Sequence, residues 1–171
     1  MEIIEKEIGH VFEIEEQVPV WKMPSVMGKD YEKIVKVIKN ENNLEMGIPY
    51  ARYIGLDWKS IMSKNLIAKF FEMFTKKWHF QVGIPVSGEI NLSEKINLSE
   101  EIKNSFINKS KYIKAIHCGA YHKVGKTYKE MYLWAIEKKL SLCTESIEFY
   151  LNDPGKVKKE ELETMILIPI I

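Results

Sequence analysis

The segment of the sequence closest to a known chemical motif runs from Gly119 to Thr127 and reads G-A-Y-H-K-V-G-K-T. Loops that cradle phosphate with backbone amides have four residues between their two glycines, whereas this segment has five. The pair Gly28-Lys29 recurs earlier in the chain without an upstream glycine. We therefore interpret the Gly-Lys pair as the start of a helix and expect no nucleotide-binding loop.

Three potential metal ligands, His117, Cys118 and His122, lie in the same region. Neighbouring positions on a strand point to opposite faces, so His117 and Cys118 would not converge on one ion. The remaining histidines, His10 and His79, have no acidic or nucleophilic neighbours in a triad pattern. We expect a packed cysteine and a turn histidine here, with no metal and no other cofactor.

A stronger candidate is the segment Ser146 to Pro154, which reads S-I-E-F-Y-L-N-D-P. Strand alternation places Ser146, Glu148 and Tyr150 on one face. A carboxylate buried there without a partner would be costly, so it should take up a proton or await a cationic or hydrogen-bonding ligand. The alternative is a solvated glutamate on an exposed face of the sheet.

Aromatic residues are available to build a pocket around this carboxylate, since the chain has four tryptophans and eight tyrosines. Rings next to predicted strands could enclose a flat or cationic guest through cation–π contacts. Core packing is the simpler explanation for any one ring taken alone, and only their joint placement favours a pocket. The predicted ligand-binding residues are Glu148, Tyr150, Tyr121, Tyr53, Trp58, Trp78, Phe80 and Tyr112.

The elements that would position these residues are duplicated. Met27–Tyr31 resembles Val124–Tyr128 at an offset of 97 positions. The same offset relates apolar residues at helical spacing in the two copies, and it also makes Tyr53 equivalent to Tyr150. Glu148, however, corresponds to Ala51, so the acid is not part of the shared scaffold.

Each copy ends in a similar apolar strand, at Phe80–Val86 and Met165–Ile170, where the offset falls to 84. We attribute the difference to a helical insertion in the first copy. The pattern predicts an α+β fold of two strand-helix-strand-strand modules, with helices on one face of an antiparallel sheet and a pseudo-twofold axis. The expected parts of this single domain are module one at about 1–88, the insertion at about 59–77, a connector at about 89–108, and module two at about 109–171.

The composition fits one body of this kind. Hydrophobic residues make up 46% of the 171 residues, and a net charge of +1 gives no bias toward nucleic acid. Met1–Gly9 does not resemble an export signal, and the longest apolar stretches are far shorter than the roughly 20 residues of a membrane helix. Two cysteines without motif spacing fit reduced thiols. We expect a cytoplasmic protein with no membrane partner.

An ordered set of short motifs resembles the GyrI-like effector-binding domain over nearly the whole chain. The motifs are His117-Cys118-Gly119-Ala120-Tyr121, a helix Gly125–Lys139 with Trp134, Glu148-Phe149-Tyr150, Asp153-Pro154, and Glu163-Thr164 leading to Ile168-Pro169-Ile170. That domain also forms the ligand-binding half of multidrug-responsive bacterial transcription regulators. The resemblance implies a ligand cleft between two modules, with Glu148, and also Tyr150 and Tyr121, facing lipophilic and often cationic ligands. One departure is Ala120, where the family often has proline.

These observations predict a standalone small-molecule binding protein, a sensor or sequestering module for a lipophilic, aromatic or cationic compound. The N-terminal residues are too few and too acidic for a helix-turn-helix, so we expect no direct nucleic-acid contact, and regulation would act through another protein. One alternative is a hydrolase of strained-ring electrophilic aromatic compounds, with Glu148 activating water and Tyr121 or Tyr150 polarising a carbonyl. The other is protein binding, like the gyrase inhibition of the family's namesake.

Overall fold

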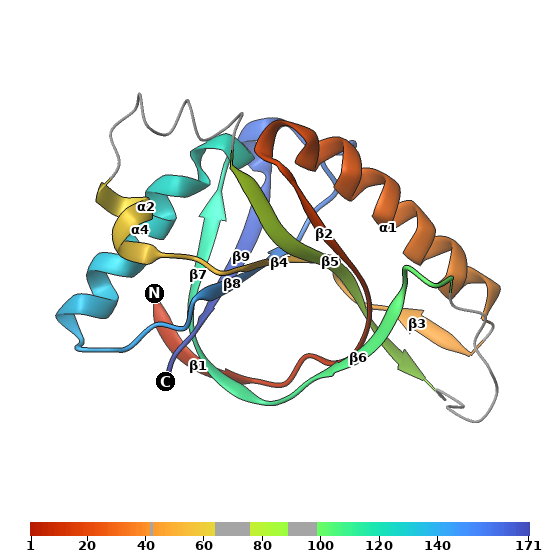
Figure 1. Cartoon of the computed structure of the whole chain (residues 1–171), viewed down its shortest axis with the longest axis horizontal. Coiled ribbons are helices and arrows are strands. Elements are labelled where there is room, and N and C mark those ends of the chain that lie inside the picture. The colour runs from red at the N-terminus through yellow and green to blue at the C-terminus, as the bar shows by residue number, and fades with distance from the viewer. Residues whose placement is uncertain (42, 64–75, 89–98) are drawn as a thin grey trace.

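An antiparallel sheet carries two long helices on one of its faces (Figure 1). The computed structural model describes residues 1–41, 43–63, 76–88 and 99–171. The strands are β1 (Glu2–Lys6), β2 (Gly9–Pro19), β3 (Leu44–Met46), β4 (Tyr50–Ile54), β5 (Lys77–Gly88), β6 (Lys103–Ile107), β7 (Ser110–Cys118), β8 (Glu145–Tyr150) and β9 (Glu163–Pro169). The α-helices are α1 (Met23–Asn40), α2 (Trp58–Ser63) and α4 (Val124–Glu137), and short 3-10 turns occupy Val20–Lys22, Tyr121–Lys123 and Lys159–Glu161.

The strand order β1-β7-β9-β8-β4-β5-β2-β6 places the two copies side by side, with β4 and β8 paired at the centre. Ala51 of β4 lies opposite Glu148 of β8. On their other sides, Ala51 pairs with Val82 of β5 and Glu148 pairs with Ile166 of β9. These pairs keep the offsets of 97 and 84 seen in the sequence. The predicted duplication about a pseudo-twofold axis is therefore confirmed.

The two ends of the strand order meet, and this closes the sheet into a curl (Figure 1). Strands β1 and β2 follow one another and pair with β7 and β6 in one continuous antiparallel register, from Glu2 opposite Lys114 to Glu13 opposite Lys103. No local pattern in the sequence predicts this closure, because the paired residues are far apart along the chain. Residues 103–107, at the end of the predicted connector, form β6, whereas residues 64–75 of the predicted insertion and 89–98 of the connector lie outside the described residues.

The two helices bury equivalent positions, Ile34 and Ile38 in α1 and Met131 and Ala135 in α4. Helix α4 begins beside Gly125, as the Gly-Lys pair predicts. The same prediction is wrong for α1, which begins at Met23, more than one turn before the first Gly-Lys pair. Pro24 in the first turn explains the difference, because its fixed φ suits a helix start and its missing N–H has no partner there anyway.

Three clusters of buried side chains hold the layers together. One lies between α1 and strands β2 and β5, and a second lies between α4 and strands β7 and β9. The third fills the inside of the curl, on the sheet face away from the helices, and includes Val11, Tyr50 and Leu167. No helix in the described ranges is both long and apolar enough to cross a bilayer.

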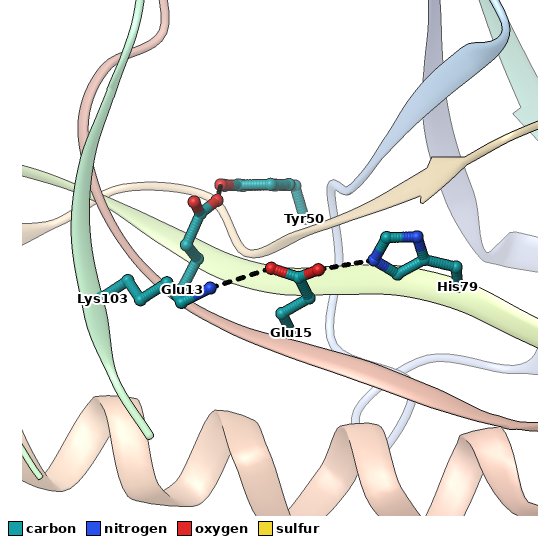
Figure 2. A network of polar contacts seen from close by, with 5 residues as sticks. All are labelled: Glu13, Glu15, Tyr50, His79 and Lys103. Atoms are coloured by element: carbon teal, nitrogen blue, oxygen red, sulfur yellow. Dashed lines mark hydrogen bonds and ion pairs between the residues drawn. The ribbon is translucent and has the colours of Figure 1, made fainter. Parts of the chain in front are cut away.

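Polar side chains tie β2 to its neighbours on the same inner face (Figure 2). The Tyr50 hydroxyl donates a hydrogen bond to Glu13 Oε2 at 2.9 Å. Glu15 accepts a hydrogen bond from Lys103 Nζ at 2.9 Å and contacts His79 Nε2 at 2.6 Å, and these two partners lower the pKa of Glu15 to about 2. Because the Glu15, His79 and Lys103 side chains are substantially exposed, this network adds little stability. It links β2 to β5 through His79 and to β6 through Lys103.

Candidate functional site

A cavity of about 1310 Å³ lies over the centre of the sheet and is lined by residues of both copies. Its walls come from α1, the β3–β4 connection, β4, α2, α4, β8 and the loop after β8. Small-molecule pockets of proteins usually measure about 300–1,000 Å³, so this one has room for a large guest. The pseudo-twofold arrangement thus places a ligand-sized cavity at the seam between the copies.

Tyrosines that are equivalent in the two copies face each other across this seam. Tyr31 on α1 corresponds to Tyr128 on α4, and Tyr53 on β4 corresponds to Tyr150 on β8; all four line the cavity. The hydroxyl oxygens of Tyr53 and Tyr150 are 3.5 Å apart. Because equivalent atoms approach each other only near the axis that relates them, the pseudo-twofold axis passes between these two hydroxyls.

Glu148 lies beside this axis with only 6% of its surface exposed. Tyr128 donates a hydrogen bond to its Oε1 at 2.8 Å, and Tyr150 donates to its Oε2 at 3.4 Å. The Tyr128 hydroxyl also lies 2.9 Å from Ser146 Oγ. Since the single hydroxyl proton of Tyr128 goes to Glu148, Ser146 acts as donor to Tyr128. The carboxylate is therefore surrounded by neutral hydroxyl donors.

Burial raises the pKa of Glu148 from an ordinary value of 4.5 to about 7, because the carboxylate loses hydration that the tyrosine hydrogen bonds only partly replace. In the described part of the chain no cationic side chain contributes to this pKa. Burial, followed by the charge of Glu148, raises the pKa of Tyr53 and Tyr128 well above their usual range. The phenols therefore stay protonated as donors, while the acid changes its charge near neutral pH.

The cavity is lined by six of the eight predicted ligand-binding residues, Glu148, Tyr150, Tyr121, Tyr53, Trp58 and Trp78. The other two are placed elsewhere. Phe80 is fully buried in the cluster beneath α1. Tyr112 points into the curl on the opposite face of the sheet, where it packs in the third cluster. Strand residues can be assigned to alternate faces from sequence, but which face a cavity occupies depends on long-range packing.

Further aromatic rings pack against the tyrosines that surround Glu148. The contacts are edge-to-face or tilted, as aromatic pairs prefer. Their centroid distances are 5.4 Å for Tyr121 and Tyr150, 6.2 Å for Trp78 and Tyr53, and 5.9 Å for Trp58 and Tyr128. Tyr121 is 36% exposed. The wall around the acid is therefore a nearly continuous aromatic surface, and Tyr121 is its more exposed part.

Sequence reasoning missed several residues that line the cavity, above all Tyr31, Tyr128 and the methionines of α1. A signal for the two tyrosines was present, because they recur at the offset of 97 next to the Gly-Lys pair. That recurrence identifies them as part of the duplicated scaffold but does not show that their hydroxyls face a cavity. The methionines carry no comparable signal, since apolar helix residues usually belong to the core.

His117 has a structural role instead of a chemical one. Its Nε2 donates to the carbonyl oxygen of Ala120 at 3.3 Å, and its Nδ1 accepts from the Thr127 hydroxyl at 2.9 Å. This arrangement ties the end of β7 to α4. The prediction of a packed cysteine is wrong, because Cys118 lies exposed at the end of β7. His122 lies in the 3-10 turn Tyr121–Lys123 and lines the cavity.

Several solved structures share this fold. The C-terminal domain of EcmrR is 17% identical, with a TM-score of 0.63 over 99% of this chain and 97% of that one. A hydrolase from Listeria innocua is 12% identical, with a TM-score of 0.61 over 99% and 92%. SAV2435, solved bound to tetraphenylphosphonium, is 15% identical, with a TM-score of 0.57 over 100% and 94%. At these identities the likeness shows a shared fold.

Sequence comparison identifies the family. A search of curated proteins found no match. The model of the GyrI-like small molecule binding domain matches residues 66–171, which is more than half of the chain. This match agrees with the fold and with the resemblance seen in the short motifs. The chain therefore belongs to the family of GyrI-like small molecule binding domains.

Proposed function

We propose that the protein binds lipophilic aromatic cations in this cavity, as a sensor or a sequestering module. The observation that carries the proposal is the environment of Glu148: an acid exposed by 6%, on the wall of a cavity of about 1310 Å³, that receives hydroxyl hydrogen bonds. None of the described cations compensates its charge.

Among the described residues, Lys129 also lines the cavity, but no cationic side chain pairs with Glu148, whose hydrogen-bond donors are Tyr128 and Tyr150. An unpaired buried carboxylate is unfavourable, and a ligand cation beside it would restore the lost electrostatic stabilisation. The faces of Tyr121, Tyr150 and Trp78 would attract the same cation through their quadrupoles. A flat or propeller-shaped aromatic cation satisfies both requirements, and SAV2435, which has this fold, is known with tetraphenylphosphonium.

A fluorescence titration tests the proposal, because Trp58 and Trp78 line the cavity and should report its occupation. We expect tetraphenylphosphonium to quench tryptophan emission saturably. Glu148→Gln keeps the size of the side chain and removes its charge, and it should weaken binding by at least about tenfold. Glu7→Gln, at an exposed position that does not line the cavity, is the matched control and should bind like wild type. Equal affinities of wild type and Glu148→Gln would refute the proposal.

A hydrolase of strained-ring electrophilic aromatic compounds is a second candidate. It is favoured by the pKa of about 7 for Glu148, which suits a general base, and by the neighbouring hydroxyls of Tyr150 and Tyr121. Glu148 would take a proton from water as the water oxygen attacks a ring carbon. The ring bond would break, its electron pair would move to the conjugated carbonyl, a tyrosine would stabilise that oxygen by donating a hydrogen bond, and Glu148 would return its proton to the product.

Mass spectrometry separates the two candidates. A cyclopropane-bearing aromatic substrate incubated with the protein should gain the mass of one water if the chain is a hydrolase, and Glu148→Gln should abolish the gain. If the substrate binds and is recovered unchanged, the hydrolase candidate is rejected and the binding function stands.

A further inference from the structure

The two copies contribute chemically different surfaces to the one cavity. The charged side chains and the histidine that line it among the described residues all come from the second copy, and they are His122, Lys129, Glu148 and Asp153. The α1 side is lined by methionines from α1 and by the β3–β4 connection, and no charged side chain from α1 or that connection lines it. The apolar residues involved are Val20, Met23, Pro24, Met27, Met46 and Ile48. The first copy thus gives the cavity an apolar surface next to α1, whereas the second copy supplies the charged side chains.

Equivalent polar groups are also used differently in the two halves. The Tyr128 hydroxyl donates a hydrogen bond to Glu148 in the cavity wall. The equivalent Tyr31 hydroxyl donates to the backbone oxygen of Tyr50 at 2.7 Å, so the protein itself satisfies it. Opposite Glu148 in the register stands Ala51, which is fully buried. The apolar half therefore offers a guest ring faces, methyl groups and thioethers, and little that could select a charge.

The cavity is large enough to hold more than one ligand. Its volume of about 1310 Å³ exceeds the roughly 300–1,000 Å³ of pockets that enclose one drug-sized ligand. A cation placed against Glu148 would occupy the half next to α4 and leave the half next to α1 empty. Methionine side chains are flexible and polarisable, so they adapt to apolar guests of different shapes.

We propose that the α1 half is a second binding subsite, which takes a neutral lipophilic aromatic molecule while the cation occupies the half next to Glu148. The proposal rests on the proposed function for the cation and adds a second class of ligand to the same cavity. Apolar surface removed from water drives this second binding event, at about 25 cal/mol per Å². Because neither α1 nor the β3–β4 connection, both of which the structure describes, contributes a carboxylate to the lining, we expect the affinity for a neutral guest there to be independent of Glu148.

The duplication supplies a matched pair of test positions, Gly28 on α1 and Gly125 on α4. Both glycines line the cavity, and a Cβ built on either would meet nothing within 4 Å. A leucine at either position would extend into the cavity and fill the half on its own side. Neither glycine has a positive φ and neither Cβ would clash, so both leucine variants should remain folded.

The experiment uses two probes, tetraphenylphosphonium followed by calorimetry and the neutral dye Nile red followed by its fluorescence. In wild type, saturating tetraphenylphosphonium should change the Kd of Nile red by less than about threefold, which is under 1 kcal/mol. Gly28→Leu should weaken Nile red binding by about tenfold or more and leave the cation within threefold of wild type. Gly125→Leu should do the reverse.

Strict competition between the probes in wild type would overturn the two-subsite proposal, and so would equal weakening of both probes by both leucine variants. Failure of the proposed function has a different signature, namely cation binding that Glu148→Gln leaves unchanged. Nile red affinity in Glu148→Gln should equal that of wild type, and a tenfold loss there would contradict the independence of the subsite.

Discussion

Cation binding should depend on pH through one group, Glu148. The buried carboxyl has a pKa of about 7 when the cavity is empty. Only its ionised form attracts a cation, and a bound cation stabilises that form, so the pKa falls on binding and a proton is released. Affinity should therefore rise as the pH increases through 7 and level off above it.

The size of the effect follows from the ionised fraction. With a pKa of about 7, roughly one molecule in eleven is ionised at pH 6 and roughly ten in eleven at pH 8. Apparent affinity scales with the competent fraction, so the Kd for tetraphenylphosphonium should fall about tenfold between these pH values. Near pH 7, each binding event should release about half a proton.

Calorimetry in buffers of different ionisation enthalpy measures both the Kd for tetraphenylphosphonium and the number of protons released. In Glu148→Gln the Kd should no longer change with pH, and no proton should be released. The control is His122→Gln, because His122 lines the same cavity as Glu148. The tyrosines that face Glu148 stay protonated throughout, since their pKa values are raised. A profile that persists in Glu148→Gln and disappears in His122→Gln would refute the reasoning.

Three further predictions concern the unliganded protein. The pKa of Glu148 is higher in the folded state, so the wild type loses stability as the pH rises from 4.5 to 7. In urea unfolding, Glu148→Gln should therefore have the stability of wild type near pH 4 and be more stable by up to about 3 kcal/mol at pH 8. Tyr128→Phe removes the 2.8 Å hydrogen bond to the carboxylate, so the pKa of Glu148 should rise further, which NMR of labelled glutamate can follow. In the same assay, Gly83→Ala should lower the free energy of unfolding by about 1–3 kcal/mol, because the new Cβ would stand 2.5 Å from the Tyr50 ring. The control is Gly125→Ala, whose Cβ would meet nothing within 4 Å, and this variant should be stabilised.

Each of these has a clear contrary result. A Glu148→Gln variant with the same stability gain at pH 4 and pH 8 would show that the gain is unrelated to ionisation. A lower pKa of Glu148 in Tyr128→Phe would show that the hydroxyl does not stabilise the carboxylate. Equal stabilities of the two alanine variants would contradict the close approach of Tyr50 to Gly83.

The duplicated scaffold could be predicted because strand register leaves a trace in the sequence. Tyr53 and Tyr150 keep one offset since a shift of one residue would turn every side chain to the other face of the sheet. Glu148 stood out against the same background, because its equivalent is Ala51. A difference between two copies of one scaffold is visible in a single sequence, without any comparison to relatives.

Closure of the sheet and the composition of the cavity could not be predicted in the same way. The pairing of Glu2 with Lys114 joins residues far apart in the sequence and leaves no local pattern. Phe80 and Tyr112 have the residue type and strand position of pocket residues, yet packing over long range buries both in core clusters. Tyr31 recurs as Tyr128 in the duplication, but only the arrangement of α1 and α4 in the fold shows that both line one cavity.

The most direct test of the central claim is a crystal structure of the protein with tetraphenylphosphonium. The cation should lie in the cavity with its rings against Tyr121 and Tyr150, and with Glu148 as the nearest carboxylate to the phosphorus. A cation bound outside the cavity, or bound within it away from Glu148, would contradict the role proposed for this acid.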